Sequence, residues 1–190
     1  LSAIEKQAIK FVKNGADIID IGGESTRPAS VYGAVKSISI QEELDRVIPA
    51  IRLINQKTDI PISIDSKNTA VIKEATKNGA SIINDVSMLK HDPNMIHLVS
   101  KLNLPYILVH NIPIPDGNNV LQQIKLDLLK SIDELLKSGL EKHNIIIDPG
   151  IGFNKNTQQN IKIINQLNLL KIGYPILIGT SRKKHIGDIL

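Results

Sequence analysis

The hydrophobic and polar positions along the 190-residue chain form short apolar runs that alternate with longer amphipathic segments. The runs are rich in Ile, Leu and Val, which is typical of parallel strands buried on both faces. The longer segments repeat apolar residues every three or four positions, which predicts helices. We expect strands at 17–22, 61–65, 81–84, 106–110, 145–148 and 175–179. We expect helices at 1–14, 39–54 (with a kink or boundary at Pro49), 69–78, 93–102, 121–135 and 157–167, and another that begins at 180–183.

An internal repeat supports this division of the chain. Residues 13–16 and 77–80 both read Lys-Asn-Gly-Ala, and each leads from a predicted helix into a predicted strand. One strand and one helix lie between the two copies, which gives about 32 residues for each unit, near the size of a βαβ crossover.

Strict alternation of strands and helices predicts an α/β fold with a parallel sheet, either a (β/α)₈ barrel or an open doubly wound sheet. One missing unit at each end would bring the chain to roughly 250 residues, the usual size of the barrel. We therefore expect one domain over residues 1–190. It is a TIM barrel truncated to about six β/α units, without strands one and eight.

Composition restricts the class of protein. The chain has no Cys, a formal charge of +4, scattered lysines and 3% aromatic residues. These features exclude disulfides and thiolate metal sites, fit a cytoplasmic protein, and argue against nucleic acid as a partner. The apolar runs are far shorter than the ~20 residues that cross a bilayer, so no membrane association is expected. A small anionic substrate is compatible with the charge.

Polar side chains follow the predicted strands at their carboxyl ends, where ligands bind in parallel α/β folds. Asp65 and Asp148 leave apolar runs, so their carboxylates favour paired donors such as an aminopyrimidine edge. Asn84 donates and accepts, which suits a heterocyclic ring. The alternatives are a helix N-cap or a partner for Lys183 in the case of the aspartates, and an Asx-turn in the case of Asn84.

The loop after the first predicted strand carries two glycines and then Thr26 and Arg27. Glycines let a backbone approach a ligand closely, and these two side chains suit phosphate or carboxylate oxygens. An ordinary turn with an exposed arginine has the same composition.

Two later segments add further candidates. Phe153 lies in a glycine-containing loop, where it either covers an aromatic substrate or faces the core. Ser181 and Lys183 lie where the last predicted helix begins, and free N–H groups with a cation there favour an anion or a carbonyl oxygen. Solvated lysines have the same pattern. We interpret His110 as a possible wall of the site and the other four histidines as surface residues, because none shows metal-ligand spacing.

Five motifs resemble those of dihydropteroate synthase, in the same order and at similar spacing. They are IDIGGESTRP at 19–28, IDS at 64–66, IND at 83–85, DPGIGF at 148–153, and SRK at 181–183 with IG at 186–187. The resemblance covers nearly all of the chain. It implies an eight-stranded barrel, usually a homodimer. The implied reaction joins 4-aminobenzoate to (7,8-dihydropterin-6-yl)methyl diphosphate, giving 7,8-dihydropteroate and diphosphate in folate biosynthesis, with Mg²⁺ help and sulfonamides as inhibitors.

By position, the resemblance implies that Asp65, Asn84 and Asp148 hold the pterin edge and that Lys183 contacts its carbonyl side. Thr26 and Arg27 then serve the diphosphate and aminobenzoate side, and Phe153 lines the aminobenzoate pocket. The candidate catalytic residues are Asp65 and Lys183, and the candidate substrate-binding residues are Thr26, Arg27, Asp65, Asn84, Asp148, Phe153, Ser181 and Lys183.

The chain also departs from the family pattern. The metal-binding Asn on strand one and the Arg-x-His on strand eight lie outside these residues, so we expect no metal ligand within this chain. Asn111, Ile151 and Lys184 stand where Met, Phe and Ser are common. Two alternatives stay open. One is a pterin-binding methyltransferase domain, against which the loops at 26–27 and 181–183 argue. The other is a catalytically inactive pterin-binding fragment, since an open barrel exposes two sheet edges.

Overall fold

A computed structural model describes residues 2–25, 37–181, 183 and 187. Its sheet has five parallel strands in the order β1-β2-β3-β4-β5. These strands are β1 (Ile19–Gly22), β2 (Ile62–Asp65), β3 (Ile82–Asp85), β4 (Tyr106–Val109) and β5 (Ile145–Asp148). The helices are α1 (Ser2–Lys13), α3 (Ile40–Lys57), α4 (Thr69–Lys77), α5 (Met95–Leu102), α6 (Val120–Lys137) and α7 (Thr157–Asn165), with short 3₁₀ turns η1 (Lys142–Asn144) and η2 (Leu167–Leu170).

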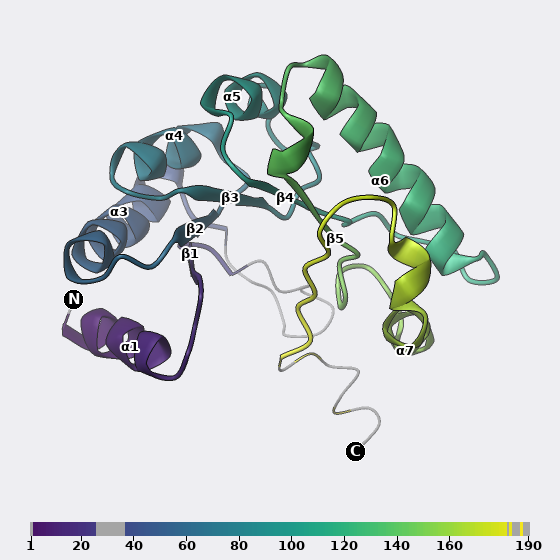
Figure 1. Ribbon diagram of the computed structural model, residues 1–190, viewed down its shortest axis with the longest axis horizontal. Helices are drawn as coiled ribbons and strands as arrows, with labels where there is room; N and C mark the ends of the chain where they lie inside the picture. Colours follow the sequence, from purple (N-terminus) through teal and green to yellow (C-terminus); the bar gives the residue numbers. More distant parts are fainter. Residues whose placement is uncertain (1, 26–36, 182, 184–186, 188–190) are drawn as a thin grey trace.

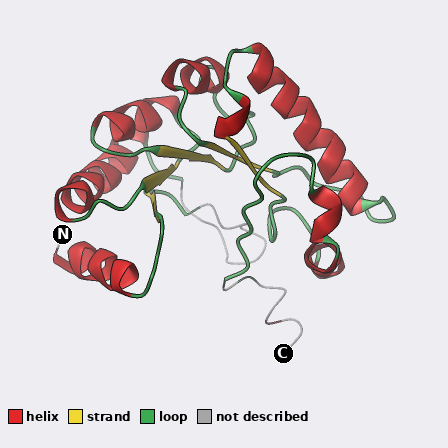
Figure 2. Ribbon diagram, viewed as in Figure 1, coloured by secondary structure: helices red, strands yellow, loops and turns green. Residues whose placement is uncertain are grey.

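The helices form an arc around one side of a curved sheet (Figures 1 and 2). Alternate strand residues such as Ile64, Ile83 and Leu108 point to this side, in one large core shared with the helices. The opposite, inner side carries a smaller cluster that includes Ile107 and Val109. The expected partial (β/α)₈ barrel is therefore confirmed.

Local sequence explains where the helices begin and end. The Ser39 hydroxyl accepts a hydrogen bond from the Glu42 N–H, which caps α3. Gly15 and Gly79, the glycines of the internal repeat, both have positive φ and follow helix ends, so the repeat marks the same turn twice. No helix in the described ranges is both long and apolar enough to cross a membrane.

Two expected features are not found, a helix boundary at Pro49 and a sixth strand. Of the two alternatives expected at Pro49, a kink or a boundary, the boundary is contradicted, because α3 runs through this residue. Pro49 is exposed, so its ring does not have to fit into the core. The predicted strand at 175–179 makes only one isolated bridge, between Ile147 and Ile176, so the described sheet has five strands and not six. Pro175 begins this segment and has no N–H with which to extend the pairing.

Candidate functional site

The strand register brings two predicted residues together at the carboxyl edge of the sheet. Asp65 at the end of β2 pairs with Gly22 of β1 on one side and with Asn84 of β3 on the other. A Cβ added at Gly22 would lie 3.3 Å from the Asp65 Cβ, so glycine is what lets the carboxylate pack closely against β1. Asp148 ends β5, at the same edge of the parallel sheet.

These side chains present acceptors that have no partner within the described chain. The Asp65 Oδ1 and Asn84 Oδ1 atoms are buried and accept no hydrogen bond from any described residue. Asp148 accepts one bond, from the Gly150 N–H at 2.7 Å. Neither aspartate caps the helix that follows it, since Asn68 occupies the cap position of α4 and Asn156 that of α7. A buried acceptor without a donor is unfavourable, so this edge favours a ligand that brings N–H groups.

Burial dominates the electrostatics of both carboxyl groups. It raises the pKa of Asp65 to about 8, helped by the negative charges of Asp20, Glu43 and Asp85 and opposed by Lys183. It raises the pKa of Asp148 to about 6, against the Gly150 N–H and the nearby cations. Donors or positive charge from a ligand would therefore favour the ionised forms.

The positive charge of Lys183 lowers the pKa of both aspartates. Its ammonium stands over the ring of Phe153, with the Nζ 4.6 Å from the ring centroid. Phe153 also packs against the inner cluster of the sheet, so it both faces this core and contacts the site. A Cβ at Gly152 would come within 2.9 Å of the Lys183 Cδ, so this glycine makes room for the lysine. Asp65, Asn84, Asp148, Phe153 and Lys183 thus share one edge.

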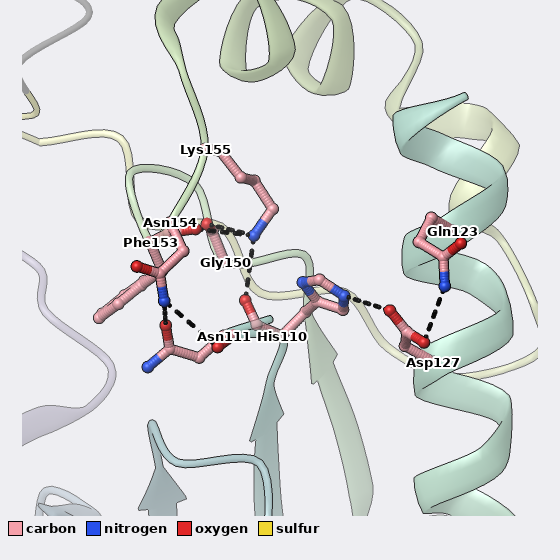
Figure 3. Close-up of polar contacts among 8 residues, drawn as sticks. All are labelled: His110, Asn111, Gln123, Asp127, Gly150, Phe153, Asn154 and Lys155. Carbon is pink, nitrogen blue, oxygen red and sulfur yellow. Dashed lines mark hydrogen bonds and ion pairs between the residues drawn. The ribbon is translucent and has the colours of Figure 1, made fainter. Parts of the chain in front are cut away.

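The remaining predicted residues fared differently. Thr26 and Arg27 lie outside the described residues, and Ser181 is exposed. His110 is not a wall of the site, because its side chain points to α6, where its Nε2 lies 3.0 Å from an Asp127 oxygen (Figure 3). Burial lowers the pKa of His110 to about 4, so the ring is neutral near pH 7.

Asp20 also lies at this site, although the strand-end pattern did not predict it. The Asn84 amide lies 3.4 Å from both Asp20 carboxylate oxygens, which places a third acidic group beside the pair on β2 and β3. Burial raises the pKa of Asp20, and the side chains of Ser63 and Asn84 oppose that rise. A carboxylate inside an apolar run was the available signal.

A second missed residue, Asp85, is structural. It is fully buried and accepts bonds from the Tyr106 hydroxyl at 2.7 Å, the Ser87 N–H and hydroxyl, and the Leu89 N–H. Its oxygens are thus occupied within the chain, and it shapes the loop after β3.

No group of three or more His, Cys, Asp or Glu that would hold a metal ion occurs among the residues the structure describes.

Comparisons with known proteins identify the family. The family profile described as "Pterin binding enzyme" matches residues 1–190. The dihydropteroate synthase of Bacillus subtilis is 43% identical over 184 residues, which cover 96% of this chain and 63% of that protein. The dihydropteroate synthase of Clostridium beijerinckii is 44% identical over 185 residues, covering 95% and 67%.

Solved structures give the same result. Dihydropteroate synthase from Clostridium difficile, determined in the presence of pteroic acid, superposes with a TM-score of 0.90 at 42% identity, covering 97% of this chain and 69% of that one. The Xanthomonas albilineans enzyme with 4-aminobenzoic acid also gives 0.90, at 35% identity, covering 99% and 67%. The chain spans about two thirds of the length of these relatives. From the full-length profile match and these relatives, the chain belongs to the pterin-binding enzyme family, among the dihydropteroate synthases.

Proposed function

We propose that the full-length protein is a dihydropteroate synthase. It joins 4-aminobenzoate to (7,8-dihydropterin-6-yl)methyl diphosphate and releases 7,8-dihydropteroate and diphosphate. The observation that carries this proposal is the set of Asp65, Asn84 and Asp148 at one edge of the sheet, with Lys183 over the Phe153 ring in the loop that follows Asp148. The names of the relatives support the same reaction.

The pterin would bind along this edge. Its aminopyrimidine N–H groups are donors in a row, which suits the unpartnered oxygens of Asp65 and Asn84 and the free capacity of Asp148. Its ring carbonyl would accept from Lys183. The structure of a relative with pteroic acid supports a ligand of this chemistry.

The aminobenzoate would pack on Phe153. This ring stands next to Lys183, so an aromatic carboxylate there would meet both an apolar face and a cation. Thr26 and Arg27, outside the described residues, would serve the diphosphate and aminobenzoate side. A relative's complex with a sulfonamide drug supports sulfonamides as ligands of the same pocket.

In the reaction, the aminobenzoate nitrogen attacks the pterin methylene carbon. The new C–N bond forms as the C–O bond to diphosphate breaks, the diphosphate takes the bonding electrons, and the nitrogen loses a proton. Positive charge develops on the pterin, and an ionised Asp65 would stabilise it. Lys183 would hold the pterin carbonyl and fix the ring for in-line attack.

We extend the proposal to the cofactor and the assembly. Mg²⁺ would help the diphosphate leave, through ligands outside the described residues. A homodimer is supported by exposed apolar side chains, Leu126, Leu129 and Leu136 on α6, Ile164 on α7 and Leu169 on η2. A cytoplasmic location is supported by the absence of Cys.

The test is product formation by the full-length protein from the pterin diphosphate and 4-aminobenzoate. We expect Asp148→Ala and Lys183→Ala to weaken pterin binding, measured by calorimetry with 6-hydroxymethylpterin. Pterin binding without product would favour the methyltransferase or the inactive fragment. Unchanged pterin affinity in both variants would refute the site.

A further inference from the structure

The ammonium of Lys155 makes an unusual set of contacts. Its Nζ donates to three backbone carbonyl oxygens, those of His110 at 3.1 Å, Gly150 at 3.1 Å and Phe153 at 3.0 Å (Figure 3). An ammonium has three N–H groups, so these bonds use all of its donors. A partly buried lysine whose donors all bond to backbone carbonyls holds those parts of the backbone together.

The three carbonyls lie in the segments that follow two neighbouring strands, β4 and β5. The His110 carbonyl follows β4, whereas Gly150 and Phe153 lie in the loop after β5. The His110 position is itself fixed, because its N–H donates to the Asp148 carbonyl at 2.8 Å and its ring contacts Asp127 of α6. Lys155 therefore fastens the β5 loop to a rigid strand end.

A second connection follows Phe153 directly. The Asn154 amide donates to the Asn111 side-chain oxygen at 2.7 Å, and the Asn111 amide donates to the Val86 carbonyl at 2.8 Å. Asn154 has a φ of 47°, a left-handed conformation that Asn tolerates better than most residues. The residues on the C-terminal side of Phe153 thus hold the loop to both β3 and β4.

The loop needs such fastening because of its sequence. Gly150 and Gly152 both have positive φ, and glycine loses the most backbone freedom when it is held in one conformation. Phe153 follows Gly152 directly, and its ring contacts Lys183. A displaced Phe153 carbonyl would move the ring and the surface it offers to a ligand.

We propose that Lys155 is a positioning residue that fixes the Phe153 ring and thereby sets the affinity for the aromatic amine, with the Asn111–Asn154 pair as the second support. This inference rests on the proposed function, because it assigns the aromatic amine to Phe153. Lys155 makes three hydrogen bonds to the loop that carries Phe153, whereas it acts on the pterin edge only through its charge near Asp148, so its loss should affect the aromatic amine more than the pterin.

The experiment compares Lys155→Met in the full-length protein with Lys130→Met, a control on the exposed face of α6. Methionine keeps an unbranched stem and removes the three donors. We expect the KM for 4-aminobenzoate to rise about 10- to 100-fold in Lys155→Met, since three hydrogen bonds to the backbone are lost together. The dissociation constant for 6-hydroxymethylpterin should change far less than this KM, and Lys130→Met should match the wild type.

A milder variant covers the case in which Lys155→Met does not fold. Asn154→Gly keeps the left-handed backbone and removes only the side-chain amide, so we expect a smaller rise in the same KM, of about 2- to 10-fold. An unchanged KM for 4-aminobenzoate in folded Lys155→Met or in Asn154→Gly, or an equal loss of pterin affinity, would overturn the role of Lys155. A wild-type protein without pterin binding or product would instead refute the proposed function.

Discussion

Gly150 offers a sharp test of how the site is built, through the substitution Gly150→Ala. Gly150 has a φ of 70°, and a Cβ there would lie 1.9 Å from the His110 carbonyl oxygen and 2.9 Å from its carbon. The obstacle is backbone that also accepts a bond from Lys155, so it cannot simply rotate away.

The magnitude follows from two contributions. A left-handed alanine costs about 1–2 kcal/mol, and forcing an extra methyl group into packed structure costs about 1–3 kcal/mol. Loss of the bond between Lys155 and the His110 carbonyl would add to both. We expect the free energy of unfolding to fall by about 4 kcal/mol, a large share of the ~5–15 kcal/mol typical of a domain.

The assay is urea unfolding of the full-length protein, with Gly117→Ala as the matched control. Gly117 has a φ of 89° and open space around its missing Cβ, so alanine there should cost only the backbone contribution of about 1–2 kcal/mol. Equal losses in the two variants would refute the close approach of the β5 loop to β4.

Three further predictions concern the buried carboxyl groups. The pKa of Asp65 is raised to about 8, so the folded chain keeps a proton that the unfolded chain has lost between about pH 4 and pH 8, and stability should fall as pH rises through that range. Asp65→Asn should flatten this dependence in urea unfolding and stabilise the ligand-free protein at pH 8; a wild-type slope in the variant would contradict the assignment. Pterin binding at pH 7 should release protons as its donors favour ionised Asp65, which calorimetry in buffers of different ionisation enthalpy detects, and a buffer-independent heat would count against it. Tyr106→Phe removes a donor from buried Asp85 and should cost about 1–3 kcal/mol of unfolding free energy, whereas Tyr174→Phe, at a partly exposed position, should cost far less.

Most of the fold could be predicted from the sequence, because the local sequence signals agreed with the tertiary structure. Gly15 and Gly79 follow helix ends, as the internal repeat predicted. Asp65, Asn84 and Asp148 lie at or next to the ends of their strands, as the apolar run before each of them predicted. The boundary expected at Pro49 was wrong because the apolar face of α3 continues on both sides of it, from Val47 and Ile48 to Ile51 and Ile54, and packs in the core.

The site residues that escaped prediction depend on distant partners. Lys155 lies in a loop, and its neighbours in the sequence give no sign of its contact with the His110 carbonyl, which follows β4. His110 seemed to face the ligand because it follows a strand, but strand alternation puts it on the side of the helices, where Asp127 meets it. Asp20 sits before the strand end, so a search limited to strand ends passed over it.

The four donors that surround Asp85 have a consequence for the neighbouring site. The chain itself supplies these four donors, so no ligand is needed to satisfy Asp85, and the negative charge of Asp85 raises the pKa of Asp65. The ligand-free protein avoids repulsion between the two side chains near pH 7, because Asp65, with a pKa of about 8, keeps its proton there. A molecule that binds an ionised Asp65 must offset this repulsion with its own donors, so a residue that does not touch the ligand still affects its affinity.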